Sequence, residues 1–280
     1  MYKGIRVVGV ENSALDSFFE NGKLEVSCLP MNNYYPNECI VLKSSDRLSG
    51  LGTIKNDYII NINENLSISG ISAKNKEQRF AISLLNDPTI QVVTLSGVPG
   101  GGKSLLSLAS ALSQSFGKNA LYEKILYIKS LETVGPSIGF LPGTVAEKVM
   151  PFMEALRDSI KICKIDKDID KLTGMDEKSK IQITPISFLR GRTLRRCFVV
   201  LDEAQNYSTH ELHTVLTRLD EASKIAIIGD TLQADVDFRQ EDRGFSRIIE
   251  EFKDSDLFAH VEFIKSQRSR LAQLVSERLG

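Results

Sequence analysis

Short apolar runs alternate with segments of helical periodicity over most of the chain after residue 75. The runs are apolar almost throughout and rich in β-branched residues, which is typical of strands covered on both faces. They lie at residues 91–97, 124–128, 181–185, 196–202, 223–230 and 261–265. Helical segments are predicted at residues 75–86, 103–116, 144–162, 208–219, 243–253 and 268–279. This alternation predicts an α/β fold, in which right-handed crossovers build a parallel sheet flanked by helices.

Residues 1–70 have a different pattern, with nine asparagines and several turn pairs between short runs of β type. These runs lie at residues 5–10, 23–29, 38–43 and 57–62. We therefore predict a small β-rich N-terminal subdomain over residues 1–70 and a larger domain over residues 71–280. A segment of this size is close to the lower limit for an independent core, so we expect it to pack on the larger domain.

The composition is that of an ordinary soluble globular chain, with 42% hydrophobic and 25% charged residues. It contains no apolar run long enough to span a bilayer, and it does not begin like a secretory signal. The four cysteines are scattered, which favours reduced thiols and a cytoplasmic location without a membrane partner. Lys plus Arg is 35 and Asp plus Glu is 36, so nucleic-acid binding would need a local basic patch.

The segment Gly-Val-Pro-Gly-Gly-Gly-Lys-Ser at residues 97–104 matches the phosphate-binding pattern G-x-x-x-x-G-K-[ST]. Glycines allow backbone N–H groups to turn inward around phosphate oxygens, and the following helix N-terminus adds unpaired donors. Lys103 would contact the β- and γ-phosphates of a bound nucleotide, and the Ser104 hydroxyl is a candidate Mg²⁺ ligand. The predicted nucleotide-binding residues here are Gly97, Val98, Pro99, Gly100, Gly101, Gly102, Lys103, Ser104 and Leu105. A chance glycine turn is the alternative, and the strand–loop–helix context argues against it.

Acidic residues follow two of the predicted strands. Asp202 and Glu203 end one buried run, and Asp230 ends the next one along the chain. Because ligands gather at the carboxyl ends of parallel strands, we expect Asp202 to hold Mg²⁺ through water. Glu203 would serve as the base for the attacking water or orient it, and Asp230 would sense the γ-phosphate. The alternatives are an acidic helix N-terminus for the pair and a simple turn at Gly229-Asp230.

Together these motifs resemble the first RecA-like domain of superfamily 1 helicases and, more closely, the PhoH-like ATPases of the phosphate-starvation-inducible type. The resemblance covers about residues 70–280 and includes DEAQ at 202–205, GDTLQ at 229–233 and Gln78, which lies nineteen residues before Gly97. Further similar segments lie at residues 134–153, 188–206 and 267–274. The resemblance implies a P-loop NTPase fold of RecA type and Mg²⁺-dependent ATP hydrolysis.

The resemblance also implies roles that spacing alone does not assign. Gln78 is similar to the residue that reads the adenine edge, and Gln233 to the γ-phosphate sensor. Arg268 is similar to an arginine that contacts the γ-phosphate, and Arg218 is a second candidate for an arginine finger. Taken without the resemblance, an arginine that opens a terminal helix is more often a surface residue.

The chain departs from the family pattern at several positions. Gly101 stands where the family usually has threonine, and Ser104 replaces threonine while keeping the hydroxyl. Lys129-Ser130 stands where an Arg-Pro pair is common, which puts any role of that pair in doubt. Residues 1–70 are too short for the PIN nuclease domain of longer members and lack a plausible acidic cluster, so we expect a short member without RNase activity.

A lone RecA-like domain leaves the γ-phosphate exposed on one side. An arginine supplied by a neighbouring copy could close the site and raise the rate by several orders of magnitude. Head-to-tail contacts of this kind close into rings. We therefore predict a homo-oligomer, with a hexameric ring implied by the family.

A cluster of arginines just before the DEAQ strand is a candidate nucleic-acid contact, because guanidinium groups bind phosphates well. It consists of Arg190, Arg192, Arg195 and Arg196. A solvated loop, or pairing with a neighbouring subunit, explains the cluster equally well. We interpret the chain as an ATPase coupled to movement on, or remodelling of, RNA or single-stranded DNA. The alternative is an ATP-controlled assembly or protein-remodelling module without nucleic acid, and a small-molecule phosphotransferase is disfavoured.

Overall fold

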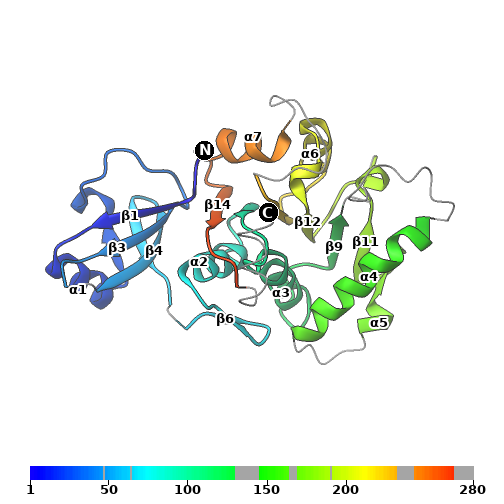
Figure 1. The fold of residues 1–280 in the computed structure, drawn as a ribbon, viewed down its shortest axis with the longest axis horizontal. Coiled ribbons are helices and arrows are strands. Elements are labelled where there is room, and N and C mark those ends of the chain that lie inside the picture. The colour runs from blue at the N-terminus through cyan, green and yellow to red at the C-terminus, as the bar shows by residue number, and fades with distance from the viewer. Residues whose placement is uncertain are drawn as a thin grey trace, which may run out of the picture. The chain divides into compact units, whose positions relative to one another are not determined.

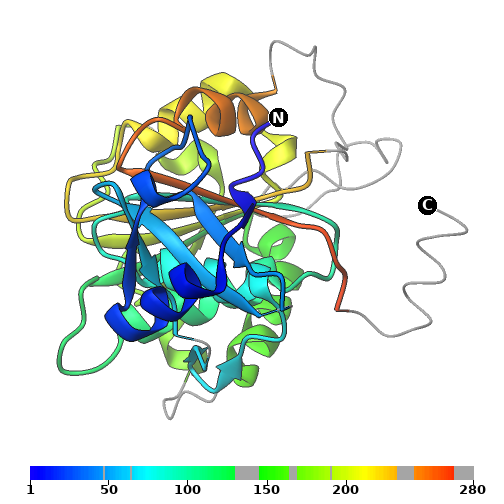
Figure 2. The same ribbon diagram turned by 90° about the vertical axis from the view of Figure 1, so that its left-hand side faces the viewer.

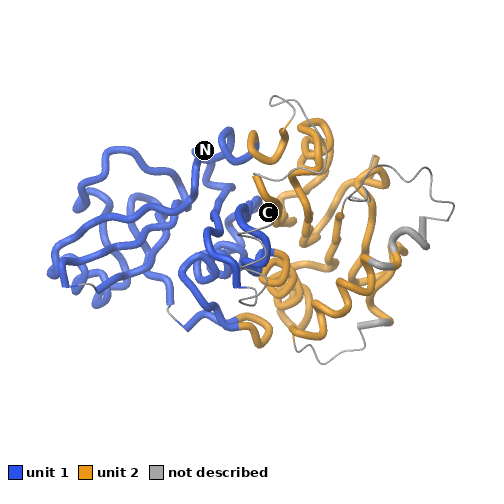
Figure 3. The backbone as a smooth tube through the Cα atoms, viewed as in Figure 1, with its two compact units in different colours: residues 1–67, 72–103, 248–280 blue, residues 68–71, 104–247 orange. Residues whose placement is uncertain are grey.

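The computed structural model describes residues 1–46, 48–63, 65–129, 145–163, 169–189, 191–231 and 243–267. The chain divides into two compact units (Figure 3). The first unit contains residues 1–67, 72–103 and 248–280, and the second contains residues 68–71 and 104–247. In the part of the chain that the structure describes, no helix is long and apolar enough to cross a membrane.

A five-stranded sheet occupies the N-terminal part of the first unit (Figures 1 and 2). Its strands are β1 (Ile5–Gly9), β2 (Lys23–Glu25), β3 (Cys39–Lys43), β4 (Ser49–Lys55) and β5 (Tyr58–Asn61), in the order β1-β3-β4-β5-β2. Strands β1 and β3 are parallel, and the other pairs are antiparallel. Each of the four runs predicted as β-type therefore contains a strand, but the run at residues 23–29 is a strand only over Lys23–Glu25 and continues as a 3-10 helix over Val26–Cys28.

The sequence patterns also missed β4 and the helix α1 (Asn12–Asn21) in this region. Leu15 and Phe18 of α1 are buried in a core cluster with residues of β3, β4 and β5. A Cβ at Gly50 of β4 would lie 2.8 Å from the ring of Phe18. The glycine thus makes room for the helix, and the same residue weakens the strand signal in the sequence.

The rest of the first unit carries the strand that precedes the phosphate loop. Helix α2 (Lys76–Asn86) packs on the parallel strands β8 (Val92–Gly97) and β14 (Phe258–Phe263). Strand β14 begins three residues before the run predicted at residues 261–265. The added residues include His260, whose buried ring lies within hydrogen-bond distance of Thr94 and Ser96 of β8. Burial lowers the pKa of His260 to about 3, so the ring is neutral and fits a strand covered by neighbours.

The N-terminal sheet is tied to β14 by hydrogen bonds within the same unit. The side chain of Asn37 donates to the carbonyls of Asp256 and Phe258, each at 2.8 Å. The N–H of Glu262 donates to the carbonyl of Lys3 at 3.1 Å. These contacts support the expectation that the N-terminal region packs on strands of the larger domain.

The second unit contains most of the larger sheet, with helices between its strands (Figure 1). Its strands are β9 (Lys124–Lys129), β10 (Thr173–Gly174), β11 (Ile181–Thr184), β12 (Cys197–Asp202) and β13 (Lys224–Ile228). Its helices include α3 (Lys103–Ser115), α4 (Val145–Ile162), α5 (Ile169–Leu172), α6 (Thr209–Leu216) and α7 (Gly244–Glu251), of which α3 and α7 cross the unit boundaries. A short hairpin, β6 (Ser67–Ile68) and β7 (Ile71–Ser72), lies between β5 and α2.

The larger sheet has seven strands in the order β10-β11-β9-β12-β13-β8-β14. The pairings within each unit are all parallel. This sheet, flanked by helices, confirms the α/β fold predicted from the alternating pattern. The helix predicted at residues 268–279 lies outside the described residues.

Candidate nucleotide-binding site

The phosphate loop connects the end of β8 to the start of α3, as predicted. Gly97 and Gly102 have left-handed backbones, with φ values of 106° and 95°. A Cβ at Gly97 would lie 2.1 Å from the carbonyl oxygen of Phe263 on β14, so only glycine fits there. The Lys103 amine donates to the carbonyls of Gly97 at 2.5 Å and Val98 at 2.9 Å. The Lys103 side chain thus folds back over the predicted phosphate loop.

The glycine at position 101 is explained by the lack of room for a side chain. Its backbone φ is not left-handed, yet an added Cβ would lie 3.0 to 3.2 Å from side-chain atoms of Phe263. The loop is also held by β14 and the segment after it, because Val98 donates to Phe263 at 3.0 Å and Gln267 donates to Gly100 at 2.9 Å. The departure from threonine at this position therefore goes together with a phenylalanine packed beneath the loop.

Gln78 contacts the phosphate loop directly. It lies in the first turn of α2, where Asn75 caps the helix by accepting from the Gln78 N–H at 2.8 Å. The buried Gln78 amide accepts from the Lys74 N–H at 2.7 Å and donates to the Gly101 carbonyl at 2.9 Å. The residue predicted to read adenine is therefore placed beside the loop, with one lone pair and one N–H left for further bonds.

In the second unit, Asp202 ends β12 as a buried carboxylate with three donors. Its Oδ1 accepts from the Ser104 hydroxyl at 3.2 Å and from the Glu203 N–H at 3.1 Å. Its Oδ2 accepts from the Tyr127 hydroxyl at 2.5 Å. Burial, and next the charge of Asp202, raise the pKa of Tyr127 well above its usual range, so the phenol is protonated and donates. The two residues predicted to hold Mg²⁺, Ser104 and Asp202, thus meet in the structure.

Glu203 follows in a left-handed backbone with φ of 56°, which is uncommon for a residue with a side chain. Its side chain is 44% exposed, and its carboxylate accepts from the Gln205 amide at 2.9 Å. The Lys129 amine lies 4.0 Å from the other carboxylate oxygen. This geometry leaves the carboxylate open to water while holding its direction.

The end of β13 lies beside the end of β12, because the two strands pair in parallel with Leu201 opposite Ile227. Asp230 follows β13, and its N–H donates to the Gln205 amide oxygen at 3.0 Å. Gln205 therefore bridges Glu203 and Asp230. Sequence reasoning placed Gln205 in a motif without giving it a task.

Tyr127 and Lys129 are the other residues near the acidic pair that sequence reasoning did not place there. Both belong to β9, which pairs with β12 so that Asp202 lies opposite Lys129. Lys129 entered the sequence analysis only as a departure from a family pattern. The signal for Tyr127 was a hydroxyl within a buried run, which needs a hydrogen-bond partner.

The predicted arginines that the structure describes lie away from the acidic pair. Arg192 and Arg195 precede β12, at the end opposite Asp202, and Arg192 pairs with Glu177 at 3.2 Å. The backbone of Arg218 bonds Leu194 beside the same amino end. Strand β12 has six residues, about 20 Å at the usual rise, so Arg218 does not reach the acidic pair of its own chain. Gln233, Arg268 and Arg190 lie outside the described residues.

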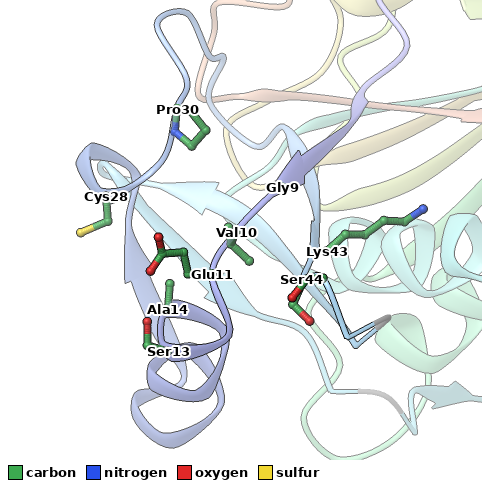
Figure 4. A pocket seen from close by; sticks show the side chains of 10 residues that line it. Gly9, Val10, Glu11, Ser13, Ala14, Cys28, Pro30, Lys43 and Ser44 are labelled. Carbon is green, nitrogen blue, oxygen red and sulfur yellow. The ribbon is translucent and has the colours of Figure 1, made fainter.

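A separate hollow lies in the N-terminal sheet (Figure 4). It has a volume of about 630 Å³ and is lined by the ends of β1 and β3 and the start of α1. Glu11 and Lys43 line it, and in Figure 4 the lysine extends away from the glutamate. Its lining, which consists of described residues, includes none of the predicted nucleotide-site residues.

A strand, a glycine loop and a helix, with acidic residues at the ends of parallel strands, define a P-loop NTPase of RecA type. A family model described as "PhoH-like protein" matches residues 70–278, and the chain belongs to this family. Protein PhoH2 of Bacillus subtilis (strain 168) is 32% identical over 294 residues, which cover 100% of this chain and 64% of the relative. Protein PhoH of Escherichia coli (strain K12) is 30% identical over 73% of this chain and 57% of that protein.

The chain therefore spans less than two thirds of the length of these relatives. Among solved structures, the arterivirus nonstructural protein 10 (helicase) in complex with DNA is similar over 88% of this chain and 52% of that chain. Its identity is 13% and its TM-score is 0.39.

Proposed function

We propose that this chain binds ATP with Mg²⁺ and hydrolyses it to ADP and phosphate. The observation that carries the proposal is the hydrogen bond from Ser104 to Asp202, which joins the end of the lysine motif to an acidic strand end. A hydroxyl and a carboxylate oxygen at this separation are the kind of ligands that Mg²⁺ prefers. Ser104 would hold the ion directly, and Asp202 would hold it through water.

The phosphate loop fits a polyphosphate because its glycines direct backbone N–H groups inward. The Lys103 amine would exchange its two carbonyl acceptors, Gly97 and Val98, for oxygens of the β- and γ-phosphates. Gln78 would use its remaining lone pair and N–H for the adenine edge. Binding of the base would then be coupled to the loop through the Gly101 carbonyl.

Bound Mg²⁺ would neutralise part of the charge on the phosphates. Glu203 would orient the attacking water or accept its proton, since its carboxylate is exposed and held by Gln205. Asp230, whose backbone N–H donates to the same glutamine, would sense the γ-phosphate. Gln233 and an arginine, with Arg268 favoured over Arg218, would complete the site.

The lysine motif provides the first test. Lys103→Ala should weaken ATP binding by roughly ten- to hundredfold, because a charge-assisted hydrogen bond is lost, and turnover should fall to background. Binding is measured by calorimetry, and turnover by phosphate release with Mg²⁺. The exposed Lys118 supplies the matched control, Lys118→Ala, which should behave as the unsubstituted chain. Turnover that persists after Lys103→Ala would refute the proposal.

Coupling of hydrolysis to RNA or single-stranded DNA is the finer part of the proposal. It is supported by the exposed side chains of Arg195 and Arg196 before β12, by the half-buried Arg192 beside them and by membership of the PhoH-like family. Stimulation of turnover by either polymer would support it. A basal rate unchanged by both would favour an ATP-controlled assembly module, an alternative supported by the ion pairs that already engage Arg192 and Arg196.

The same proposal includes a homo-oligomer, with a hexameric ring as the expected form. It is supported by the position of Arg218, which would reach an acidic pair only from another copy. Light scattering with ATP and Mg²⁺ tests this point. A monomer at micromolar concentration would contradict it.

A further inference from the structure

We propose that Tyr127 is a positioning residue that fixes the metal-facing carboxylate of Asp202 and thereby sets the affinity of the nucleotide site for its divalent ion. This inference rests on the proposed function. Tyr127 belongs to β9, and its hydroxyl donates to Asp202 Oδ2 at 2.5 Å. Only 7% of Tyr127 and 6% of Asp202 are exposed, so water does not readily replace this bond.

The strand register explains how the phenol reaches the acid. Tyr127 lies opposite Val200 on β12, and Asp202 is two residues further along that strand. Side chains two residues apart in a strand share a face, so Tyr127 and Asp202 are on the same face of the sheet. A diagonal neighbour at this spacing is within reach of an aromatic side chain.

The two oxygens of Asp202 have different partners. Oδ2 is taken by the phenol, whereas Oδ1 accepts from Ser104 and the Glu203 N–H. The final torsion of an aspartate side chain is broad, so the carboxylate by itself has no strongly preferred rotation. Tyr127 therefore fixes the rotation of the carboxylate that turns one oxygen toward Ser104, the residue that would hold the ion directly.

The pairing also explains why a tyrosine stands in an otherwise apolar run. A phenylalanine would fill the same volume and keep the buried ring. The hydroxyl adds a donor, and the charge of a buried carboxylate needs donors to offset its lost hydration. The structure thus assigns the hydroxyl to Asp202 and the ring to the core.

The test is Tyr127→Phe, with Tyr122→Phe as the matched control. Tyr122 is also buried and lies just before β9, and its ring packs edge-on against Phe198 at 5.3 Å. Mn²⁺ serves as the probe ion, and its binding to the complex with a non-hydrolysable ATP analogue is followed by electron paramagnetic resonance. Nucleotide binding in EDTA and the melting temperature are measured beside it.

Tyr127→Phe should weaken Mn²⁺ binding by about tenfold, the scale seen when a partner of a metal ligand is removed. Nucleotide binding in EDTA should stay unchanged, and Tyr122→Phe should match the unsubstituted chain in both. Equal Mn²⁺ affinity in Tyr127→Phe would overturn the inference. So would an equal loss of nucleotide affinity in EDTA, which would indicate a general structural role.

Failure of the proposed function has a different signature. If the unsubstituted chain binds no ATP analogue, or if the ion does not bind to the complex, the ATPase proposal itself fails. Asp202→Asn provides the reference for complete loss of the carboxylate. A loss in Tyr127→Phe that is smaller than the loss in Asp202→Asn is the expected order.

Discussion

Strand β12 has a charged residue with a left-handed backbone at each end, Arg196 before it and Glu203 after it. At the amino end, the Arg196 N–H donates to Asp220 at 3.2 Å and its carbonyl accepts from the Glu123 N–H at 2.7 Å. The guanidinium pairs with the Glu123 carboxylate at 2.9 Å, and both side chains are more than half exposed, at 53% and 65%. The left-handed residue there lies in a bend of the chain, and both charged side chains are exposed to water.

At the carboxyl end the residue with the same backbone feature directly follows a buried carboxylate, Asp202. Asp202 is held by three donors, and Glu203 is directed by Gln205. Exposed ion pairs are screened and weak, whereas a buried carboxylate depends on the placement of each donor. At the carboxyl end of β12 the position of each hydrogen-bond donor is therefore fixed, whereas at the amino end the charged side chains interact weakly and are exposed to solvent. At the carboxyl end, replacing a single atom should change ATP turnover strongly. At the amino end, removing a whole side chain should have little effect on turnover or stability.

The largest expected effect is at Glu203. Glu203→Gln should lower turnover by at least about a hundredfold, because the amide cannot take the proton of the attacking water. ATP binding should persist, since the amide oxygen can still accept from Gln205. Steady-state phosphate release and calorimetric ATP binding check the two parts.

Glu123→Gln at the amino end is the matched control for that substitution. It removes the same charge from an exposed ion pair and should leave turnover unchanged. Similar losses in both variants would erase the contrast between the two ends. Unchanged turnover in Glu203→Gln would remove this residue from the reaction.

Local motifs made the phosphate loop and the acidic strand ends predictable from sequence. The glycine loop, Lys103 and Ser104 lie between a run of strong strand character and the helix that follows it, and the acids Asp202 and Asp230 lie at or just after the ends of two such runs. Each signal is contained within a few consecutive residues. Parallel pairing then brings the ends of β12 and β13 together with no further information.

The residues that were missed depend on contacts between distant segments. From the sequence alone Tyr127 resembles a core residue, because Asp202 lies 75 positions further along the chain and the pairing of β9 with β12 is needed to bring the two together. Strand β4 was missed for a related reason. Its glycines leave room for the side chains of Phe18 and Ile59, and the residues next to them in the sequence do not indicate these contacts.

A smaller effect is expected from the arginines before β12. The double substitution Arg192→Ala with Arg195→Ala should lower single-strand binding and reduce the salt slope of log K by about 1.4, or about 0.7 for each lost phosphate contact. ATP turnover without nucleic acid should be unchanged. Fluorescence anisotropy over a range of salt concentrations measures the slope.

The control for this pair replaces two exposed lysines of the second unit, Lys118→Ala with Lys161→Ala. It changes the net charge by the same amount and should leave the slope unaltered. Equal changes in both double variants would point to bulk charge instead of a defined contact. A slope unchanged by the arginine pair would remove this cluster from the account of nucleic-acid binding.

The smallest expected effect concerns the backbone of Arg196. Arg196→Ala loses an exposed ion pair worth less than about 1 kcal/mol and keeps a side chain on a left-handed backbone. Arg196→Gly loses the same pair but removes the steric cost of that backbone, so it should be more stable than Arg196→Ala by about 1 kcal/mol. Urea unfolding of the two variants gives the comparison, with equal m-values as the condition. If Arg196→Ala is as stable as Arg196→Gly, the turn before β12 does not depend on its left-handed residue, and the likeness between the two ends of the strand is superficial.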